Sequence, residues 1–298
     1  MKNAILLMWL IISCGVVFGQ EERSADTSES HDSVSAPEPA PVDKRGLRIA
    51  KKNVIKNMWF APSKRDYEAI AIEREDVEKY SDFLAAPDRG LIRLHDSSKC
   101  EASKNVVNLE EPCPSNFIYG KGASYSFRTH KYRSVMFSDL EFYEKKLYAV
   151  GLNTQGILTT LGGVALDAVS LETNGIKQLH AFAPARDYSA VNNQITAFLK
   201  GVRAGRFVYQ KSLPINKNET YVLRSIAYGG KVVQRQGPFK VNLFADDKRD
   251  DVIIVFRVVR EHADGSITLL WKEINRQPAP KLNFEKAKKQ SSTQNLKN

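Results

Sequence analysis

Hydrophobic residues between positions 76 and 274 occur mostly in short runs that are rich in β-branched and aromatic side chains. Such runs are typical of β-strands, and they alternate here with glycine-containing or charged segments that predict turns. Asp264-Gly265 is the clearest hairpin signal, because this dipeptide favours the tight turn between antiparallel strands. Strands are predicted at 91–94, 123–128, 140–143, 147–150, 157–161, 176–182, 207–210, 221–228, 252–260 and 267–274.

Two segments have helical periodicity instead. Residues 76–84 space their apolar side chains as on one face of a helix. A second helix is predicted to begin with Asp187 as its N-cap and to end near Gly201, since Asp caps helix N-termini and glycine commonly follows the last turn. Its apolar side is formed by Val191, Ile195, Phe198, Leu199 and Val202.

This order of elements indicates a fold class. Most consecutive strands follow each other without a helix between them, so we expect them to pair antiparallel. We therefore predict an α+β fold that is β-rich, with a predominantly antiparallel sheet and about two packed helices. Residues 46–282 are assigned to a single β-rich globular domain, and a subdivision near 185–205 is the alternative.

Residues 1–19 have the pattern of a secretory signal peptide. Lys2 precedes an apolar run over 4–18, which is shorter than the ~20 residues of a membrane-spanning helix. No later run is long and apolar enough to span a membrane, so no span is predicted in the mature chain. We predict a secreted or periplasmic protein. The segment before Cys14 also resembles the lipobox of bacterial lipoproteins, so a lipid anchor at the envelope through Cys14 is the alternative.

The segments on either side of the predicted domain are polar. Residues 20–45 form an acidic linker rich in proline and serine, and residues 283–298 form a basic tail. Neither has enough large apolar side chains to offset the entropy lost on ordering, so both are predicted to be disordered.

The charge distribution indicates the kind of partner. The whole chain has a formal net charge of +10; residues 20–45 contribute −4, and residues 46–282 carry +10 by themselves. A basic domain favours anionic partners, such as an envelope component or an extracellular polymer. Nucleic acid is not an expected partner, because export separates the chain from most of it. With 42% hydrophobic and 26% charged residues, the chain is not a largely disordered protein.

Cysteine usage agrees with export. Apart from Cys14 the chain contains Cys100 and Cys113, whose spacing matches neither a CxxC redox motif nor a zinc site. In an oxidising compartment such a pair favours a structural disulfide. We predict a bond between Cys100 and Cys113.

Compact catalytic and cofactor motifs are absent from the sequence. It contains no G-x-S-x-G elbow, no S-x-x-K, no H-E-x-x-H, no P-loop and no EF-hand loop. Its histidines lie outside metal-ligand spacing of one another and of the cysteines. No catalytic residue, metal site or cofactor is therefore predicted.

Basic and aromatic residues interleave at Arg128, Lys131, Tyr132 and Arg133. This pattern can bind an anionic polymer through charge and stacking. The alternative is an ordinary solvated strand end.

Two further arginines, Arg224 and Arg257, fall on apolar faces of predicted strands by period-two alternation. A guanidinium there must be paired or lie at an edge. It can form an anion pocket, or an internal ion pair with a carboxylate such as Glu273 or Asp251.

The leading hypothesis is an exported, non-enzymatic binding or scaffolding protein of unknown ligand, an anionic envelope or extracellular polymer being the favoured kind. The alternative is a secreted hydrolase whose active site is dispersed along the chain and carries no motif.

Overall fold

The computed structural model describes residues 64, 68, 70–100, 122–236, 239–245 and 247–283. All of them belong to one compact unit, Lys44–Asn298, while a second unit, Met1–Asp43, lies outside the described residues. The predictions made for residues 1–45, for the tail beyond Asn283 and for Cys113 also fall outside. The signal peptide, the lipid anchor and the disulfide therefore stay predictions.

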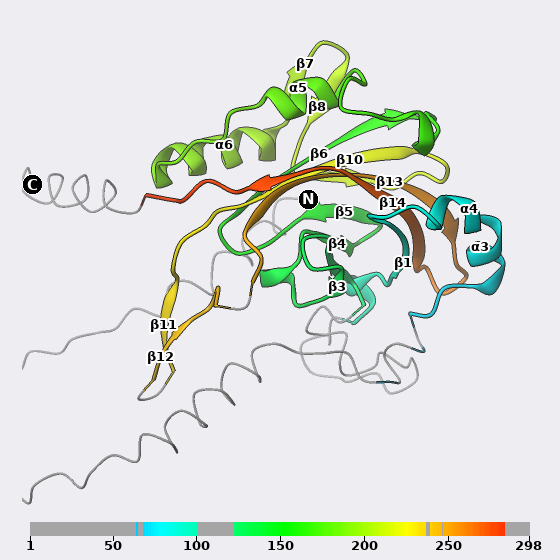
Figure 1. Ribbon diagram of the computed structural model, residues 1–298, viewed down its shortest axis with the longest axis horizontal. Helices are drawn as coiled ribbons and strands as arrows, with labels where there is room; N and C mark the ends of the chain where they lie inside the picture. Colours follow the sequence, from blue (N-terminus) through cyan, green and yellow to red (C-terminus); the bar gives the residue numbers. More distant parts are fainter. Residues whose placement is uncertain are drawn as a thin grey trace, which may run out of the picture. The chain divides into compact units, whose positions relative to one another are not determined.

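A central antiparallel sheet of five strands forms the middle of the unit (Figure 1). Its strand order is β1-β14-β13-β10-β6, so strands distant in sequence are neighbours in space. These strands are β1 (Arg89–Leu94), β14 (Ile267–Pro278), β13 (Asp250–Glu261), β10 (Thr220–Ala227) and β6 (Thr154–Gly162).

A second antiparallel sheet, of order β3-β2-β4-β5-β9, packs against one face of the central sheet. Phe127, Leu140 and Phe142 meet Phe256 and Trp271 in the core between them. The sheets approach closely at Gly156, where a Cβ would lie 2.3 Å from that of Ala149, so only glycine fits. The strands are β3 (Lys131–Tyr132), β2 (Ser124–Ser126), β4 (Leu140–Tyr143), β5 (Lys146–Ala149) and β9 (Ser212–Pro214).

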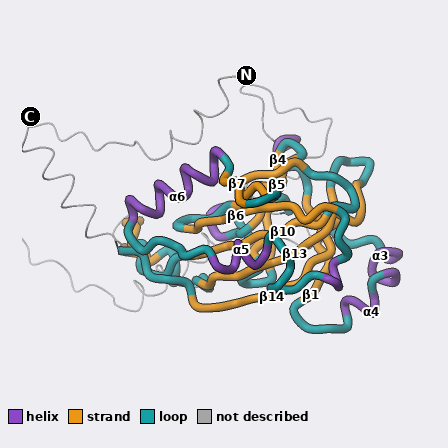
Figure 2. The backbone as a smooth tube through the Cα atoms, turned by 90° about the horizontal axis from the view of Figure 1, so that it is seen from above, coloured by secondary structure: helices purple, strands orange, loops and turns teal. Residues whose placement is uncertain are grey.

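Helices and a short hairpin cover the opposite face of the central sheet (Figures 1 and 2). Because both faces are covered, every position of β10 is buried, including polar residues such as Arg224 and Ser225. The covering elements are α4 (Ser81–Leu84), η4 (Leu166–Ala168), α5 (Ile176–Ala181), α6 (Tyr188–Lys200), β7 (Val202–Ala204) and β8 (Phe207–Tyr209). Helix α3 (Arg74–Lys79) precedes α4 and is joined to β13 by the Asp76–Arg260 ion pair. None of the helices among the described residues is both long and apolar enough to cross a membrane.

A two-stranded ribbon, β11 (Val233–Gln236) and β12 (Phe239–Asn242), extends from the sheets at the lower left of Figure 1. At its base Leu243 and Phe244 pack against Phe137, which belongs to the short helix η3 (Val135–Phe137). A further short helix, η1 (Ser97–Cys100), follows β1.

The predicted fold class is confirmed: the described unit is β-rich and antiparallel with packed helices. The helix after Asp187 is confirmed as well, since the Asp187 carboxylate accepts from the amides of Ser189 and Ala190 and Gly201 is the C-cap. The hairpin at Gly265 joins β13 to β14 with φ of 81°. The predicted helix 76–84 is divided at Tyr80 into α3 and α4.

The strand predicted at 176–182 is wrong, because this segment forms helix α5. Its two buried apolar side chains, Ile176 and Leu179, stand three positions apart, which is helical spacing. The β-branched Ile176 favoured a strand, but packing onto the central sheet decides the conformation.

Candidate functional site

Arg128 lies at the centre of a buried ionic network. Its side chain is fully buried, with Nε donating to Asp139 at 2.7 Å and Nη1 donating to Asp247 at 2.9 Å. Further donors reach the carbonyls of Lys248 and Phe137. Burial alone would lower the pKa of Arg128, but the two aspartates raise it above its usual value, so the guanidinium is charged. Its donors are engaged by the protein, and no surface of it is left for a polymer.

The same network contains Arg133, Asp139, Asp247 and Arg249, and we call these residues with Arg128 the Arg128 network. Asp247 accepts from Arg133 Nη1 at 3.3 Å and from Arg249 Nη1 at 2.8 Å. Asp139 also accepts from the Ser225 hydroxyl at 2.6 Å. Charge-assisted hydrogen bonds thus link three parts of the chain: strand β10, the start of β4 and the segment between β12 and β13.

Arg249 fixes the ribbon base to the rest of the unit. It donates to the carbonyls of Tyr228, Leu152 and Asn153, and its guanidinium lies 3.8 Å from the centre of the Phe244 ring. Phe244 in turn packs in the apolar cluster at the base of the ribbon. The Arg128 network is therefore the anchor of the ribbon.

The structure separates the four residues of the basic–aromatic segment. Arg128 is buried, Arg133 is half-buried against Asp247, and only Lys131 is exposed. The Tyr132 hydroxyl bonds to the amide and carbonyl of Arg93, and its ring packs on another tyrosine. These four side chains do not form a common exposed surface.

Arg224 forms the internal ion pair that was one of its two interpretations. Its Nε and Nη2 donate to Asp251 at 2.9 and 2.7 Å. Its Nη1 donates to the carbonyls of Leu179, His180 and Phe182 at the end of α5, where carbonyls lack donors from a further helical turn.

Arg257 is half-buried on the same face of the central sheet. Its Nη1 donates to the carbonyl of Val164 at 3.2 Å. It stands opposite Thr220, the first residue of β10, and four positions along β13 from Ile253, the residue opposite Arg224. No contact among the described residues brings the two guanidinium groups into one pocket, and Arg257 donates to a backbone carbonyl instead.

The ribbon carries a basic surface that sequence reasoning missed. Lys231, Arg235 and Lys240 are all exposed, and no carboxylate of the described residues is in ion-pair contact with them. Arg235 stands directly opposite Lys240 in the β11–β12 register. Like charges at such a position destabilise a strand pair, so an anion bound there would relieve the repulsion. One signal was available: residues 229–245 contain three basic and no acidic residues.

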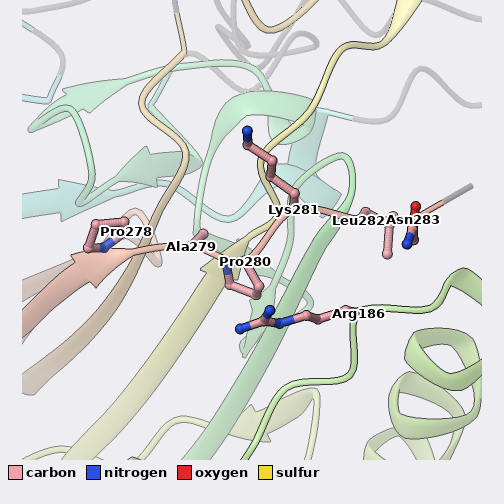
Figure 3. A pocket seen from close by; sticks show the side chains of 7 residues that line it. All are labelled: Arg186, Pro278, Ala279, Pro280, Lys281, Leu282 and Asn283. Carbon is pink, nitrogen blue, oxygen red and sulfur yellow. The ribbon is translucent and has the colours of Figure 1, made fainter.

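A pocket lies along the end of β14, lined by Arg186 and residues 278–283 (Figure 3). Figure 3 shows Arg186 beside Pro280, whereas the Lys281 side chain points away from it. The lining residues include neither a carboxylate nor a histidine. Among the described residues no group of three potential metal ligands comes together.

One row of polar side chains has the order of a nucleophile, a base and an acid. Thr268 Oγ1 lies 2.8 Å from His262 Nε2, and His262 Nδ1 lies 3.9 Å from the Glu73 carboxylate. The Thr268 side chain is fully buried, however, so no substrate reaches its hydroxyl in this conformation. The row is a packed polar cluster at the β13–β14 turn.

The titration of His262 gives a testable pH dependence. Burial, followed by the neighbouring Arg93, lowers the pKa of His262. The unfolded chain therefore binds this proton more tightly, and the free energy of unfolding should fall as the pH drops below about 6.5. Urea unfolding between about pH 5 and 7.5 measures the slope. His262→Gln should flatten it and His180→Gln, at an exposed position, should not; equal slopes in both variants would refute this assignment.

The chain matches no protein family model, no curated protein and no solved structure.

Proposed function

We propose that this chain is an exported, non-enzymatic binding or scaffolding protein whose β11–β12 ribbon contacts an anionic envelope or extracellular polymer. The observation that carries the proposal is the pair Arg235 and Lys240, two exposed cations held directly opposite each other. Their repulsion is a cost to the free protein that a line of anionic groups removes. The anchor beneath the ribbon supports the proposal, because a fixed base holds the cations in place for a ligand.

Export is part of the same proposal. It rests on the predicted signal peptide, and the Cys100–Cys113 disulfide would form in the compartment that export reaches. Mass spectrometry of the mature N-terminus distinguishes its two versions. A start at Gln20 supports free secretion, and a lipid-modified Cys14 supports anchorage at the envelope.

The ribbon is tested with heparin as a model polyanion. The double variant Arg235→Ser/Lys240→Ser should weaken heparin binding about tenfold and reduce its dependence on salt concentration, because fewer counterions are released. The matched control is Lys146→Ser/Lys217→Ser, which removes the same charge from exposed positions elsewhere. An equal loss in both variants would mean that net charge alone drives binding, and it would overturn the role of the ribbon.

The second candidate function is hydrolysis, favoured only by the row Thr268, His262 and Glu73. Turnover of a nitrophenyl ester is measured for the native chain and for Thr268→Val, to decide between hydrolysis and a non-enzymatic function. An activity that Thr268→Val abolishes would support a hydrolase. Absence of turnover, or turnover that this variant leaves unchanged, counts against this row as its active site.

A further inference from the structure

A second exposed surface lies on the helical side of the unit, where α6 ends and the β7–β8 hairpin begins (Figure 1). We call it the α6–β7 patch, and its side chains are those of Leu199, Lys200, Val202, Arg203 and Arg206, all exposed. Leu199 is 64% exposed, the highest value among the large hydrophobic side chains that the structure describes. Two exposed apolar side chains and three exposed cations thus stand within eight consecutive positions of the chain.

The local fold explains why these side chains face outward. Val191 and Phe198 hold α6 in the core, whereas Leu199, in the last turn at the edge of the predicted apolar side, lies outside the core and is exposed. Gly201, with φ of 87°, ends the helix and leads directly into β7. The last turn of α6 is held by a further hydrogen bond, in which the amide of Lys211 donates to the carbonyl of Phe198 at 3.1 Å. The exposure of Leu199 is therefore built into the fold.

The charge around the patch has one sign. Residues 188–211 contain four basic and no acidic residues. Arg206 lies over the Phe207 ring at 5.0 Å, and no described carboxylate forms an ion pair with Lys200, Arg203 or Arg206. A soluble polyanion would be bound by these cations without Leu199. A partner that binds both the apolar side chains and the cations must present anionic groups above an apolar layer.

We propose that the α6–β7 patch contacts the surface of a membrane that contains anionic phospholipids. Leu199 and Val202 enter the headgroup region, while Lys200, Arg203 and Arg206 bind lipid phosphates. This contact is independent of the ribbon, because Figure 1 shows the β7–β8 hairpin and β11–β12 on opposite sides of the central sheet. One molecule can therefore engage a membrane and a polymer together.

The test is co-sedimentation with vesicles of phosphatidylcholine mixed with phosphatidylglycerol, compared with vesicles of phosphatidylcholine alone. The chain is used from Gln20 onward, since the apolar residues 4–18 would bind vesicles by themselves. It should bind the mixed vesicles and not the neutral ones. Leu199→Gln/Val202→Gln and Arg203→Ser/Arg206→Ser should each weaken this binding about tenfold, whereas Lys146→Ser/Lys217→Ser should leave it unchanged.

Two further measurements separate the alternatives. Leu199→Gln/Val202→Gln should still bind heparin as the native chain does, which distinguishes failure of this proposal from failure of the ribbon. Thermal unfolding of each variant checks that it is folded. If the apolar variant binds mixed vesicles as tightly as the native chain, the membrane contact is overturned. It is also overturned if that variant turns a dimer into a monomer in gel filtration, because the patch would then be covered by a second copy.

Discussion

Asp139→Ala is expected to lower the free energy of unfolding by about 3–5 kcal/mol, because it breaks a buried ion pair from one side. Arg128 and Asp139 are both fully buried, so the guanidinium cannot replace the lost carboxylate with water. The substitution also removes the acceptor of the Ser225 hydroxyl and of the Arg128 amide. Urea unfolding at neutral pH measures the loss.

An exposed ion pair provides the control for this experiment. Asp167 lies 3.4 Å from Arg89, but its side chain is 75% exposed. Asp167→Ala should therefore cost less than about 1 kcal/mol. Should the two alanine variants unfold with similar free energies, the Arg128 network would not be the stabilising anchor described above.

Arg224→Met is the second substitution expected to have a large effect, also about 3–5 kcal/mol. It leaves the Asp251 carboxylate, 1% exposed, without its guanidinium partner. It also removes the Arg224 donor from three carbonyls at the end of α5, although the Leu179 carbonyl still accepts from the Phe182 amide. Urea unfolding gives the overall loss, and hydrogen exchange over residues 176–182 should show that α5 opens more readily than the strands.

A double variant isolates the electrostatic part of this effect. Arg224→Met/Asp251→Leu removes both charges, so it should be more stable than Arg224→Met by itself. The gain will be incomplete, because the α5 carbonyls still lack the Arg224 donor and the Gln277 amide loses its acceptor. If the double variant is as unstable as the sum of the two single substitutions, the buried charge is not the cause.

The strands of the central sheet are predictable because their residues carry the information locally. β13 and β14 are long, apolar and joined by a glycine turn, and the predicted segments 252–260 and 267–274 lie within them. α5 is not predictable in the same way. It has six residues, and its last carbonyls are satisfied by Arg224, more than 40 positions away. A contact between residues so far apart in the sequence cannot be recognised from the pattern of neighbouring residues.

The candidate sites follow the same rule. Alternation along β10 placed Arg224 on an apolar face, and pairing with Asp251 was one of the stated interpretations. One of the two carboxylate partners of Arg128 was not accessible to such reasoning, since Asp247 lies 119 positions further along the chain. The ribbon was missed because its strands have four residues each, too few for an apolar period to stand out.

The connection between the ribbon and β13 has a mechanical consequence. If a polymer binds β11–β12 as proposed, a pull on it is transmitted through the chain after β12 to the first residue of β13, Asp250. β13 is paired on both sides, with β10 over seven positions and with β14 over eleven. A force directed along β13 therefore loads both rows of hydrogen bonds in shear, while the Arg128 network holds the base of the ribbon against η3 and the β5–β6 connection.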